Sequence, residues 1–437
     1  TEVLAIQTPN KCNDEPTPER LKFSWKMFRQ KDVAETMPFA FGFGDGGGGP
    51  TIDHIEYAHR LANMSGVPRL TWGKAEDTYD RLAKTTDWSK IPVFHDEMYY
   101  ERHRGCQTSQ ARTKRNNRKS ELLARDTEFL ATLAFLDGND YPQNDINDAW
   151  KLILLNQFHD ILPGSSIQEV YDEADRDYAK VFQVLGDIRD ESLRKIGGAS
   201  STSTATKRVS VQNTLGWTRT DVAALDARGV PDEPVSVLDS DGKAVPCQRV
   251  TNLDETITLL FEVENVPSFG RAMYQLVDGV HPVKMTGPKA PKASKTKLEN
   301  DFFEVRFGRD GSIDRLWDKR QHRNVLSDGA KGNELTLFED HPAGSDAWDV
   351  NFNVFEVSEE YELDGSNTVI ENGPVRATVR VVRRSANSVV TQNISVWRTI
   401  PRIDFTTRVE WFEKHRLLKA AFPVDVTSRR ATYEIQY

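Results

Sequence analysis

A histidine and an aspartate stand side by side at positions 159 and 160, between the end of one apolar helix pattern and the start of the next. An imidazole nitrogen is a common zinc ligand, and a carboxylate beside it can bind a metal or a sugar hydroxyl. The alternative is structural, because a histidine at a helix end can also hydrogen-bond the last carbonyls. A position between two helices favours side chains that project into a cleft.

A second carboxylate, Asp45, lies in the glycine-rich run 42–49, directly after the strand-like residues 37–41. Glycines let the backbone approach a ligand closely, and a carboxylate at the C-terminal end of a strand is where an α/β barrel carries its chemistry. The run also contains the spacing of a dinucleotide-binding turn. Pro50 and the charge of Asp45 both disfavour a pyrophosphate there. A structural role, in which Asp45 closes a tight turn, is the other alternative.

Two further segments carry polar and aromatic groups that suit ligands. Residues 95–97, His-Asp-Glu, and His103 offer metal-binding atoms, but they lack the paired spacing of a metal site. Trp348 stands between aspartates at 346 and 349, and an indole face flanked by carboxylates suits a pyranose ring. A purely structural tryptophan explains that segment equally well.

Three amphipathic helices are predicted around the His159–Asp160 pair, over residues 109–137, 145–158 and 167–196. Asp145 is the predicted N-cap of the second helix, and Pro163-Gly164 ends it. Ser166 and Glu169 have the spacing of a capping box for the third. Consecutive helices with short connections predict a bundle.

The start of the first helix is basic, and nucleic-acid binding is one interpretation of such a run. A solvated face, or ion pairs with neighbouring carboxylates, fits better in a chain whose formal net charge is -9. The basic residues are Arg112, Lys114, Arg115, Arg118 and Lys119.

The pattern changes to a period of two after the flexible segment 197–205, which predicts β structure to about residue 279. A second hinge is predicted at 287–295. Beyond it, Asp310-Gly311 predicts a hairpin turn, and residues 375–381 and 404–411 alternate as half-buried strands do. Several such strands in series predict a sandwich. The predicted domains are 1–100, the C-terminal part of an α/β domain; 101–197, a helical bundle; 207–285, a small β domain; and 297–437, a β-sandwich.

Composition describes a soluble globular protein, with 28% charged and 38% hydrophobic residues among 437. No apolar run is long enough to span a membrane, and the first residues, Thr1-Glu2-Val3-Leu4, do not have the pattern expected of a secretory signal. The three cysteines, Cys12, Cys106 and Cys247, have no CxxC spacing, which disfavours a disulfide scaffold. The chain starts without methionine and ends directly after a strand-like run, so we expect a piece of a longer protein.

The string from Trp150 to Tyr171 closely resembles the signature of the class II α-mannosidases, glycoside hydrolase family 38. The resemblance implies that His159 ligates a zinc ion at the catalytic site and that Asp160 contacts the sugar. The run 41–51 resembles the cytosolic/vacuolar and bacterial branch of that family, and there Asp45 falls at the general acid/base position. Residues 101–109 resemble a substrate-lining loop, with Arg104 in it and His103 where other branches carry an aromatic ring.

The β segment that opens with Asn213-x-Leu215-x-Trp217 also resembles the family, so the resemblance covers most of the chain. It implies a multidomain α+β protein with part of a β/α-barrel-like catalytic domain, a three-helix bundle and β-sandwich domains. The implied reaction is retaining hydrolysis of terminal α-mannosyl residues of oligosaccharides, with zinc as cofactor and cobalt as a substitute. Such chemistry needs a nucleophile and an acid/base about 5 Å apart.

The sequence departs from the family because it contains no His-x-Asp pair and no nucleophile motif. Half of the site is therefore expected to lie in an N-terminal barrel half, and the polypeptide alone is expected to be inactive and to bind zinc weakly. The resemblance to the cytosolic/vacuolar branch implies a cytoplasmic or vacuolar location. The oligomeric state is not predicted, and a homo-oligomer is one alternative. A non-catalytic carbohydrate-binding or structural module is the alternative. A nucleotide-dependent enzyme would need a βαβ unit around Gly42.

Overall fold

The computed structural model describes residues 4–11, 13–44, 48–95, 103–197, 206–228, 230, 234–342, 344–430 and 432. The chain forms two compact units, Thr1–Tyr99 and Tyr100–Tyr437, and each is described by itself. Along the described residues, no helix combines the length and the apolar character that crossing a bilayer requires.

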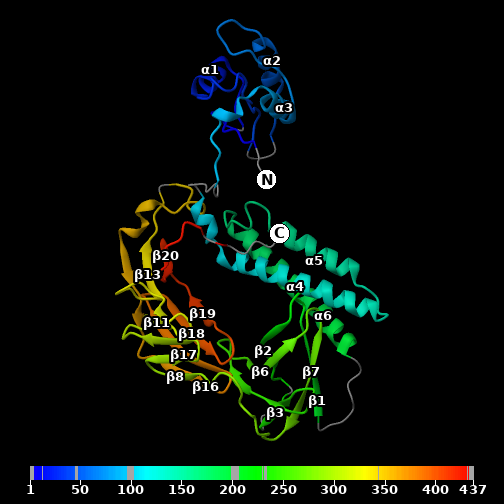
Figure 1. Ribbon diagram of the computed structural model, residues 1–437. Coiled ribbons are helices and arrows are strands. Elements are labelled where there is room, and N and C mark those ends of the chain that lie inside the picture. The colour runs from blue at the N-terminus through cyan, green and yellow to red at the C-terminus, as the bar shows by residue number, and fades with distance from the viewer. Residues whose placement is uncertain are drawn as a thin grey trace. The chain divides into compact units, whose positions relative to one another are not determined.

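The first unit is helical in its described part, with α1 (Pro18–Met27), α2 (Ile52–Leu61), α3 (Ala75–Thr85) and the 3-10 turn η1 (Trp88–Lys90) (Figure 1). Thr51 caps α2, because its hydroxyl accepts from the amide of His54. A parallel bridge between Asp14 and Phe41 is the only β pairing among residues 4–95 that are described, and it falls at the end of the predicted strand-like run. The barrel-like character of this part stays a prediction.

The second unit opens with the 3-10 turn η2 (Arg104–Gln107) and three α-helices, α4 (Ala111–Leu136), α5 (Gln143–Asn156) and α6 (Gln168–Gly197). Figure 1 shows the three lying together. Their apolar stripes share one buried core, since residues at helical spacing on each helix face the same interior. Its buried members are Ala124, Ala131, Ile146, Ala149, Ile153, Val181 and Leu185.

Two predicted caps differ from the structure. The N-cap of α5 is Pro142, so Asp145 lies in the first turn. The helix begins earlier because the Pro142 carbonyl already accepts from the amide of Ile146 at 3.1 Å. The sequence also predicted that Ser166 would cap α6. Instead, the hydroxyl of Ser166 donates to the carbonyl of Asp160 at 2.7 Å.

Residues 206–278 form a first β-sandwich of two antiparallel sheets, ordered β1-β7-β3-β4 and β2-β6-β5. Side chains that alternate along the strands fill the space between the sheets, with Phe261 and Leu259 of β6 against Tyr274 of β7. The strands are β1 (Thr206–Gln212), β2 (Arg219–Asp226), β3 (Val235–Leu238), β4 (Ala244–Val245), β5 (Cys247–Thr251), β6 (Ile257–Val266) and β7 (Arg271–Asp278).

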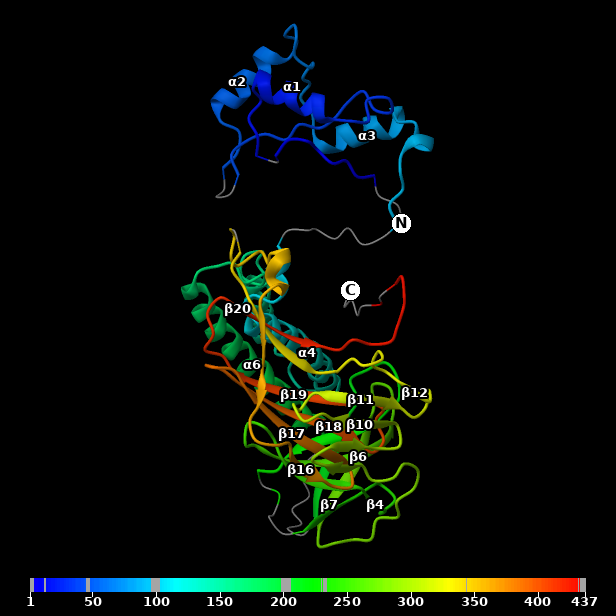
Figure 2. The same cartoon turned by 90° about the vertical axis from the view of Figure 1, so that its left-hand side faces the viewer.

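Residues 292–421 form a second sandwich, whose yellow and orange strands can be followed in Figure 2. Its sheets are ordered β12-β11-β10-β9-β8 and β15-β17-β18-β19, with β16 beside β17, and a third sheet is ordered β14-β13-β20. The strands are β8 (Lys292–Ser294), β9 (Lys297–Glu299), β10 (Phe303–Phe307), β11 (Ile313–Asp318), β12 (Arg323–Asn324), β13 (Glu334–Glu339), β14 (Ser358–Glu360), β15 (Glu362–Leu363), β16 (Thr368–Asn372), β17 (Arg376–Arg384), β18 (Val389–Trp397), β19 (Ile403–Glu410) and β20 (Arg416–Ala421), and the 3-10 turn η3 is Phe352–Phe355.

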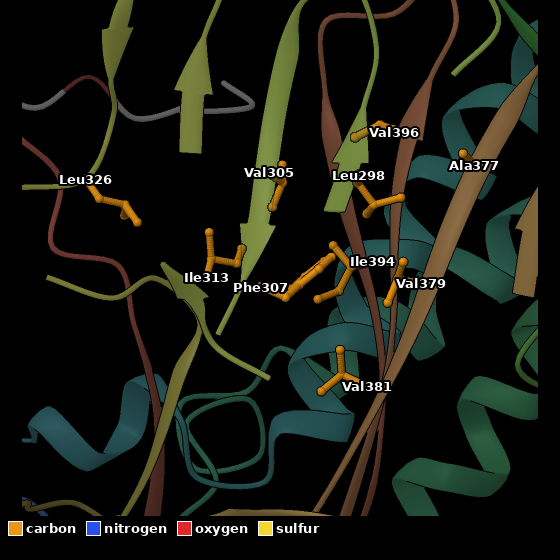
Figure 3. Close-up of a cluster of buried hydrophobic side chains, with 10 residues drawn as sticks. All are labelled: Leu298, Val305, Phe307, Ile313, Leu326, Ala377, Val379, Val381, Ile394 and Val396. Carbon is orange, nitrogen blue, oxygen red and sulfur yellow. The ribbon is translucent and has the colours of Figure 1, made fainter. Parts of the chain in front are cut away.

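Buried aliphatic side chains fill the space between the first two of these sheets (Figure 3). Val305 on β10 and Ile394 on β18 are 0% exposed. Buried positions alternate along β10, whereas residues 392–397 of β18 are all buried. The predicted hairpin at Asp310-Gly311 is confirmed, since β10 pairs antiparallel with β11.

The two sandwiches meet at a seam where β6 buries both of its faces. Leu260 packs against Val375 and Trp397 of the second sandwich. Beside it, Glu262 pairs with Arg398, and both side chains are 3% exposed. Arg398 also donates to the carbonyls of Thr286 and Pro288 at 3.0 and 2.9 Å.

The same seam is extended by a glutamine of the first sandwich. The side chain of Gln248 accepts from the amides of Val375 and Arg376 at 3.1 and 2.8 Å and donates to the Arg376 carbonyl at 3.0 Å. The predicted hinge at 287–295 is therefore anchored at Pro288 and continues as strand β8.

Candidate functional site

His159 and Asp160 lie in a tight turn that directly follows α5. The amides of Ile161 and Leu162 donate to the carbonyl of Phe158 at 2.9 and 3.1 Å. The His159 side chain is 76% exposed, and its Nε2 lies 3.4 Å from Oδ2 of Asp160. A nitrogen that is so accessible, next to a carboxylate, suits a ligand better than the capping alternative does.

Asp160 is held in place by side chains that follow it. The hydroxyl of Ser165 donates to Oδ1 of Asp160 at 3.0 Å, and the hydroxyls of Ser166 and Tyr171 donate to its carbonyl at 2.7 and 3.3 Å. The rotamer and the backbone of Asp160 are thereby both restrained, while Oδ2 stays directed towards His159. Such restraint is what a residue that positions a ligand requires.

The loop 103–109 is joined to the loop 345–349 of the second sandwich. The amide of His103, which has a left-handed φ of 63°, donates to Oδ1 of Asp349 at 2.6 Å. The amide of Gly105 donates to the carbonyl of Trp348 at 2.7 Å, and the ring centroids of His103 and Trp348 lie 6.2 Å apart. The structure thus brings the predicted residues His103, Arg104 and Trp348 into one place.

Two glycines allow these segments to approach each other. A Cβ on Gly105 would lie 3.0 Å from the carbonyl of Trp348. Gly164, with a φ of +96°, packs on the 103–109 loop, and a Cβ there would lie 2.5 Å from the carbonyl oxygen of Ser109. We refer to the loop 103–109, the turn 159–166 and the loop 345–349 together as the loop cluster.

The thiol of Cys106 lies within the electrostatic reach of all three segments of the loop cluster. Burial raises the pKa of this thiol, Lys114 opposes the rise, and the carboxylates of Asp349 and Asp160 add to it. The thiol is therefore protonated at neutral pH, and it belongs to the packing of the cluster rather than to its reactive groups.

The other predicted carboxylate, Asp45, lies outside the described residues, as do positions 96 and 97 of the His-Asp-Glu run. The flanks of the glycine-rich run are described, and the amide of Phe43 donates to the carbonyl of Gly49 at 3.0 Å. A Cβ on Gly42 would lie 2.9 Å from the backbone at 49–50, and the φ of Gly42 is +125°. The described flanks of the glycine-rich run therefore lie against each other, and the role of Asp45 stays a prediction.

The metal-binding capacity of the loop cluster is incomplete. In the described ranges, no three histidine, cysteine, aspartate or glutamate side chains are grouped so that they could hold a metal ion. His159 supplies one accessible nitrogen and Asp160 an oxygen 3.4 Å from it. These two groups have the right donor chemistry for zinc, but a catalytic zinc site has three protein ligands.

One contact of the site was missed by the sequence interpretation. Lys114, which the basic run placed on a solvated face, donates from Nζ to the carbonyls of Ser109, Leu162 and Pro163 at 2.6, 2.8 and 3.1 Å. Arg112 does form the expected kind of ion pair, with Asp175 at 2.6 Å. No side-chain pattern marks the partners of Lys114, because all three are backbone carbonyls.

Two protein-family models match the chain. The model described as the glycosyl hydrolases family 38 C-terminal domain matches residues 298–437, and the alpha mannosidase middle domain matches residues 101–196. The loop cluster therefore draws its segments from both matched regions.

Three relatives are similar in sequence to most of this chain. Alpha-mannosidase 2C1 of Homo sapiens is 30% identical over 94% of the chain, which spans 37% of that protein. Alpha-mannosidase G of Dictyostelium discoideum is 31% identical over 91% of the chain, which spans 38% of it. The alpha-mannosidase of Saccharomyces cerevisiae is 27% identical over 91%, and the chain spans 34% of it. The chain thus covers little more than a third of these relatives.

The fold is shared with solved structures. A glycosyl hydrolase family 38 protein from Enterococcus faecalis superposes with a TM-score of 0.66 at 18% identity, covering 94% of this chain and 55% of that one. An alpha-mannosidase from Enterococcus faecalis V583 gives 0.67 at 17% identity, covering 86% and 50%.

Proposed function

Because the chain belongs to glycosyl hydrolase family 38, we propose that the full-length protein containing it is a retaining α-mannosidase that removes terminal α-mannosyl residues from oligosaccharides. The observation that carries the proposal is the loop cluster. It gathers His159, Asp160, His103, Arg104 and Trp348 from the helical part and from the second sandwich. An imidazole, carboxylates, a guanidinium and an indole face are the groups with which a protein binds a metal and a sugar ring.

Each residue has a proposed role. His159 would give its accessible nitrogen to zinc, or to cobalt as a substitute, and Asp160 would accept hydrogen bonds from sugar hydroxyls. His103, Arg104 and Trp348 would line the sugar. When bound, the ion would hold hydroxyls of the sugar and favour a distorted ring. The chain's own contribution is to orient the ring, through the restrained carboxylate of Asp160.

Asp45 is the proposed general acid/base. The nucleophile and the remaining metal ligands are assigned to segments outside these 437 residues, because the sequence contains no His-x-Asp pair and no nucleophile motif of the family. On this proposal the chain alone is inactive and binds zinc weakly. A cytoplasmic or vacuolar location belongs to the same proposal.

The test is hydrolysis of p-nitrophenyl α-mannoside by the full-length protein with zinc or cobalt, together with its metal content. His159→Ala should lose activity and bound metal together. Asp45→Asn should lose activity, by roughly 10²- to 10⁴-fold as for other general acids, and keep its metal. His281→Ala is the matched control, since that histidine is exposed in a segment remote in sequence from the cluster.

The outcomes separate the candidate functions. Unchanged activity in Asp45→Asn would move the acid/base to another residue, and unchanged metal content in His159→Ala would remove its role as a ligand. A non-catalytic carbohydrate-binding module is the second candidate, because the proposed sugar contact Trp348 lies on a β-sandwich loop. Binding of mannosides without hydrolysis by the full-length protein would favour that module.

A further inference from the structure

We propose that Lys114 is a positioning residue of the site, whose ammonium group joins the loop of His103 and Arg104 to the turn of His159 and Asp160. The proposal rests on the proposed function and deepens it. It names the contact that fixes the metal-binding and sugar-binding groups relative to one another.

The geometry of the ammonium group carries the inference. An ammonium has three N–H donors, and Nζ of Lys114 has three carbonyl acceptors at 2.6, 2.8 and 3.1 Å. One acceptor, Ser109, ends the 103–109 loop, while Leu162 and Pro163 belong to the turn after Asp160. All three donors are therefore used to connect two segments that are about 50 positions apart in sequence.

A cation is the group that this position needs. The carbonyl oxygens of Ser109, Leu162 and Pro163 all lie within 3.1 Å of Nζ, so the negative ends of three carbonyl dipoles face one point, where they repel each other. A positive charge among them converts that repulsion into attraction, and hydrogen bonds to a charged group are stronger than neutral ones. Burial lowers the pKa of Lys114, because the charged ammonium group loses hydration free energy there that an exposed lysine would keep.

The support beneath Lys114 is rigid. It lies on the first turns of α4, a helix of 26 residues whose buried face packs on α5 and α6. The helix also continues directly from the 103–109 loop. Lys114 therefore holds the His159–Asp160 turn in a fixed position relative to α4. Its loss would let this turn and the 103–109 loop separate without unfolding the core.

The expected consequence is a loss of alignment. Displacement of a binding group by about 1 Å can cost on the order of a hundredfold in rate, and loss of a residue that orients a metal ligand costs about tenfold to a hundredfold. Lys114→Met keeps the length of the side chain and removes the charge and the donors. It should lower kcat/KM for p-nitrophenyl α-mannoside by about tenfold to a hundredfold and raise KM.

The experiment compares four variants of the full-length protein. Lys114→Met and Lys114→Gln remove the charge, Lys114→Arg keeps a cation with several donors, and Lys119→Met is the matched control on an exposed position of the same helix. We expect Lys114→Arg to recover part of the activity and Lys119→Met to match the unmodified protein. Hydrogen exchange of the peptides spanning 103–109 and 158–166 should accelerate together in Lys114→Met and stay unchanged in Lys119→Met.

Each outcome decides the proposal. A KM equal to that of Lys119→Met, with kcat reduced only by the folded fraction, would overturn it, because a purely structural lysine changes the amount of enzyme and leaves KM unchanged. If Lys114→Met does not fold, Lys114→Gln decides, and unchanged kinetics in that neutral variant would refute the role. If the full-length protein hydrolyses no α-mannoside, the proposed function fails. The exchange of the two peptides then still supports or refutes the connection by Lys114.

Discussion

The seam between the two sandwiches and the loop cluster both join segments that are far apart in sequence, but they use different contacts. At the seam, Glu262 and Arg398 form an ion pair with both side chains 3% exposed, surrounded by apolar packing. At the loop cluster, backbone amides donate to a backbone carbonyl and to the carboxylate of Asp349. Glycines stand at the closest approach, and the imidazole of His159 is 76% exposed.

The difference follows from what each region must do. A buried charge without its partner is costly, so the seam penalises any arrangement other than the native one. A site must leave its reactive groups accessible, so it cannot be fixed by burying them. Backbone contacts fix the course of the loops without burying the reactive side chains. Measurements on the seam and on the loop cluster test this contrast, beginning with the largest expected effect, and a partly exposed ion cluster provides a third point of comparison.

The seam should be the more costly region to break. Arg398→Met leaves Glu262 buried and without its partner, and the free energy of unfolding should fall by about 3–5 kcal/mol. Urea denaturation followed by circular dichroism measures this loss. The matched control is Arg228→Met, which breaks an ion pair whose arginine is 92% exposed and should leave the free energy of unfolding nearly unchanged.

A double variant sharpens the result. Arg398→Met combined with Glu262→Gln removes both charges and should regain part of the lost stability, because no unpaired charge then stays buried. A loss below about 1 kcal/mol in Arg398→Met alone would mean that water reaches the seam.

The loop cluster should be sensitive at its glycines. Gly164→Ala places a Cβ 2.5 Å from the carbonyl oxygen of Ser109 at a φ of +96°, so we expect a loss of about 2–3 kcal/mol in the free energy of unfolding. Gly186→Ala is the matched control, since Gly186 lies within α6 with open space where a Cβ would go. That change should stabilise the protein by about 0.5–1 kcal/mol, as alanine favours a helix interior. Equal melting temperatures for the two variants would contradict the close approach.

The smallest effect concerns a partly exposed ion cluster of the second sandwich. Hydrogen bonds from Lys297 and then Lys319 lower the pKa of Glu299 to about 2. A lowered pKa means that the stabilisation is present above the unfolded value, near 4.5, and is lost as the pH falls towards 2. With allowance for solvent screening, Glu299→Gln should cost about 1 kcal/mol at pH 7.

The effect of Glu299→Gln can be measured by thermal unfolding between pH 7 and pH 3. The difference in stability between the unmodified protein and Glu299→Gln should shrink as the pH falls. A constant difference across that range would show that the lysines do not lower the pKa of Glu299.

Local patterns in the sequence predicted the helices well. The expected ranges 109–137 and 167–196 became Ala111–Leu136 and Gln168–Gly197, because an amphipathic stripe of that length has few alternatives. The placement of His159–Asp160 in a turn followed from Pro163-Gly164. The predicted N-cap of α5, Asp145, was wrong because the helix already begins at Gln143, after Pro142, and no side chain caps it.

The long-range contacts of the site lay beyond such patterns. The bond from Gly105 to Trp348 joins two backbone atoms, which every residue possesses and which no motif distinguishes. The bond from His103 to the carboxylate of Asp349 joins residues 246 positions apart, which no local pattern relates. Lys114 has the same residue type as the solvated Lys119 five positions later, and only the tertiary structure separates their roles. The pairing of Glu262 with Arg398 likewise depends on the register of two separate sandwiches.

The bond from the Ser109 hydroxyl to the carbonyl of Ala347, 2.8 Å long, also sets an order of events during synthesis. The two residues are separated by 238 positions, which a ribosome needs roughly ten to fifty seconds to add. The helices can fold during that interval, but the 103–109 loop must wait for its partner to emerge. A nascent chain released before residue 345 would therefore carry folded helices and an unfinished loop cluster.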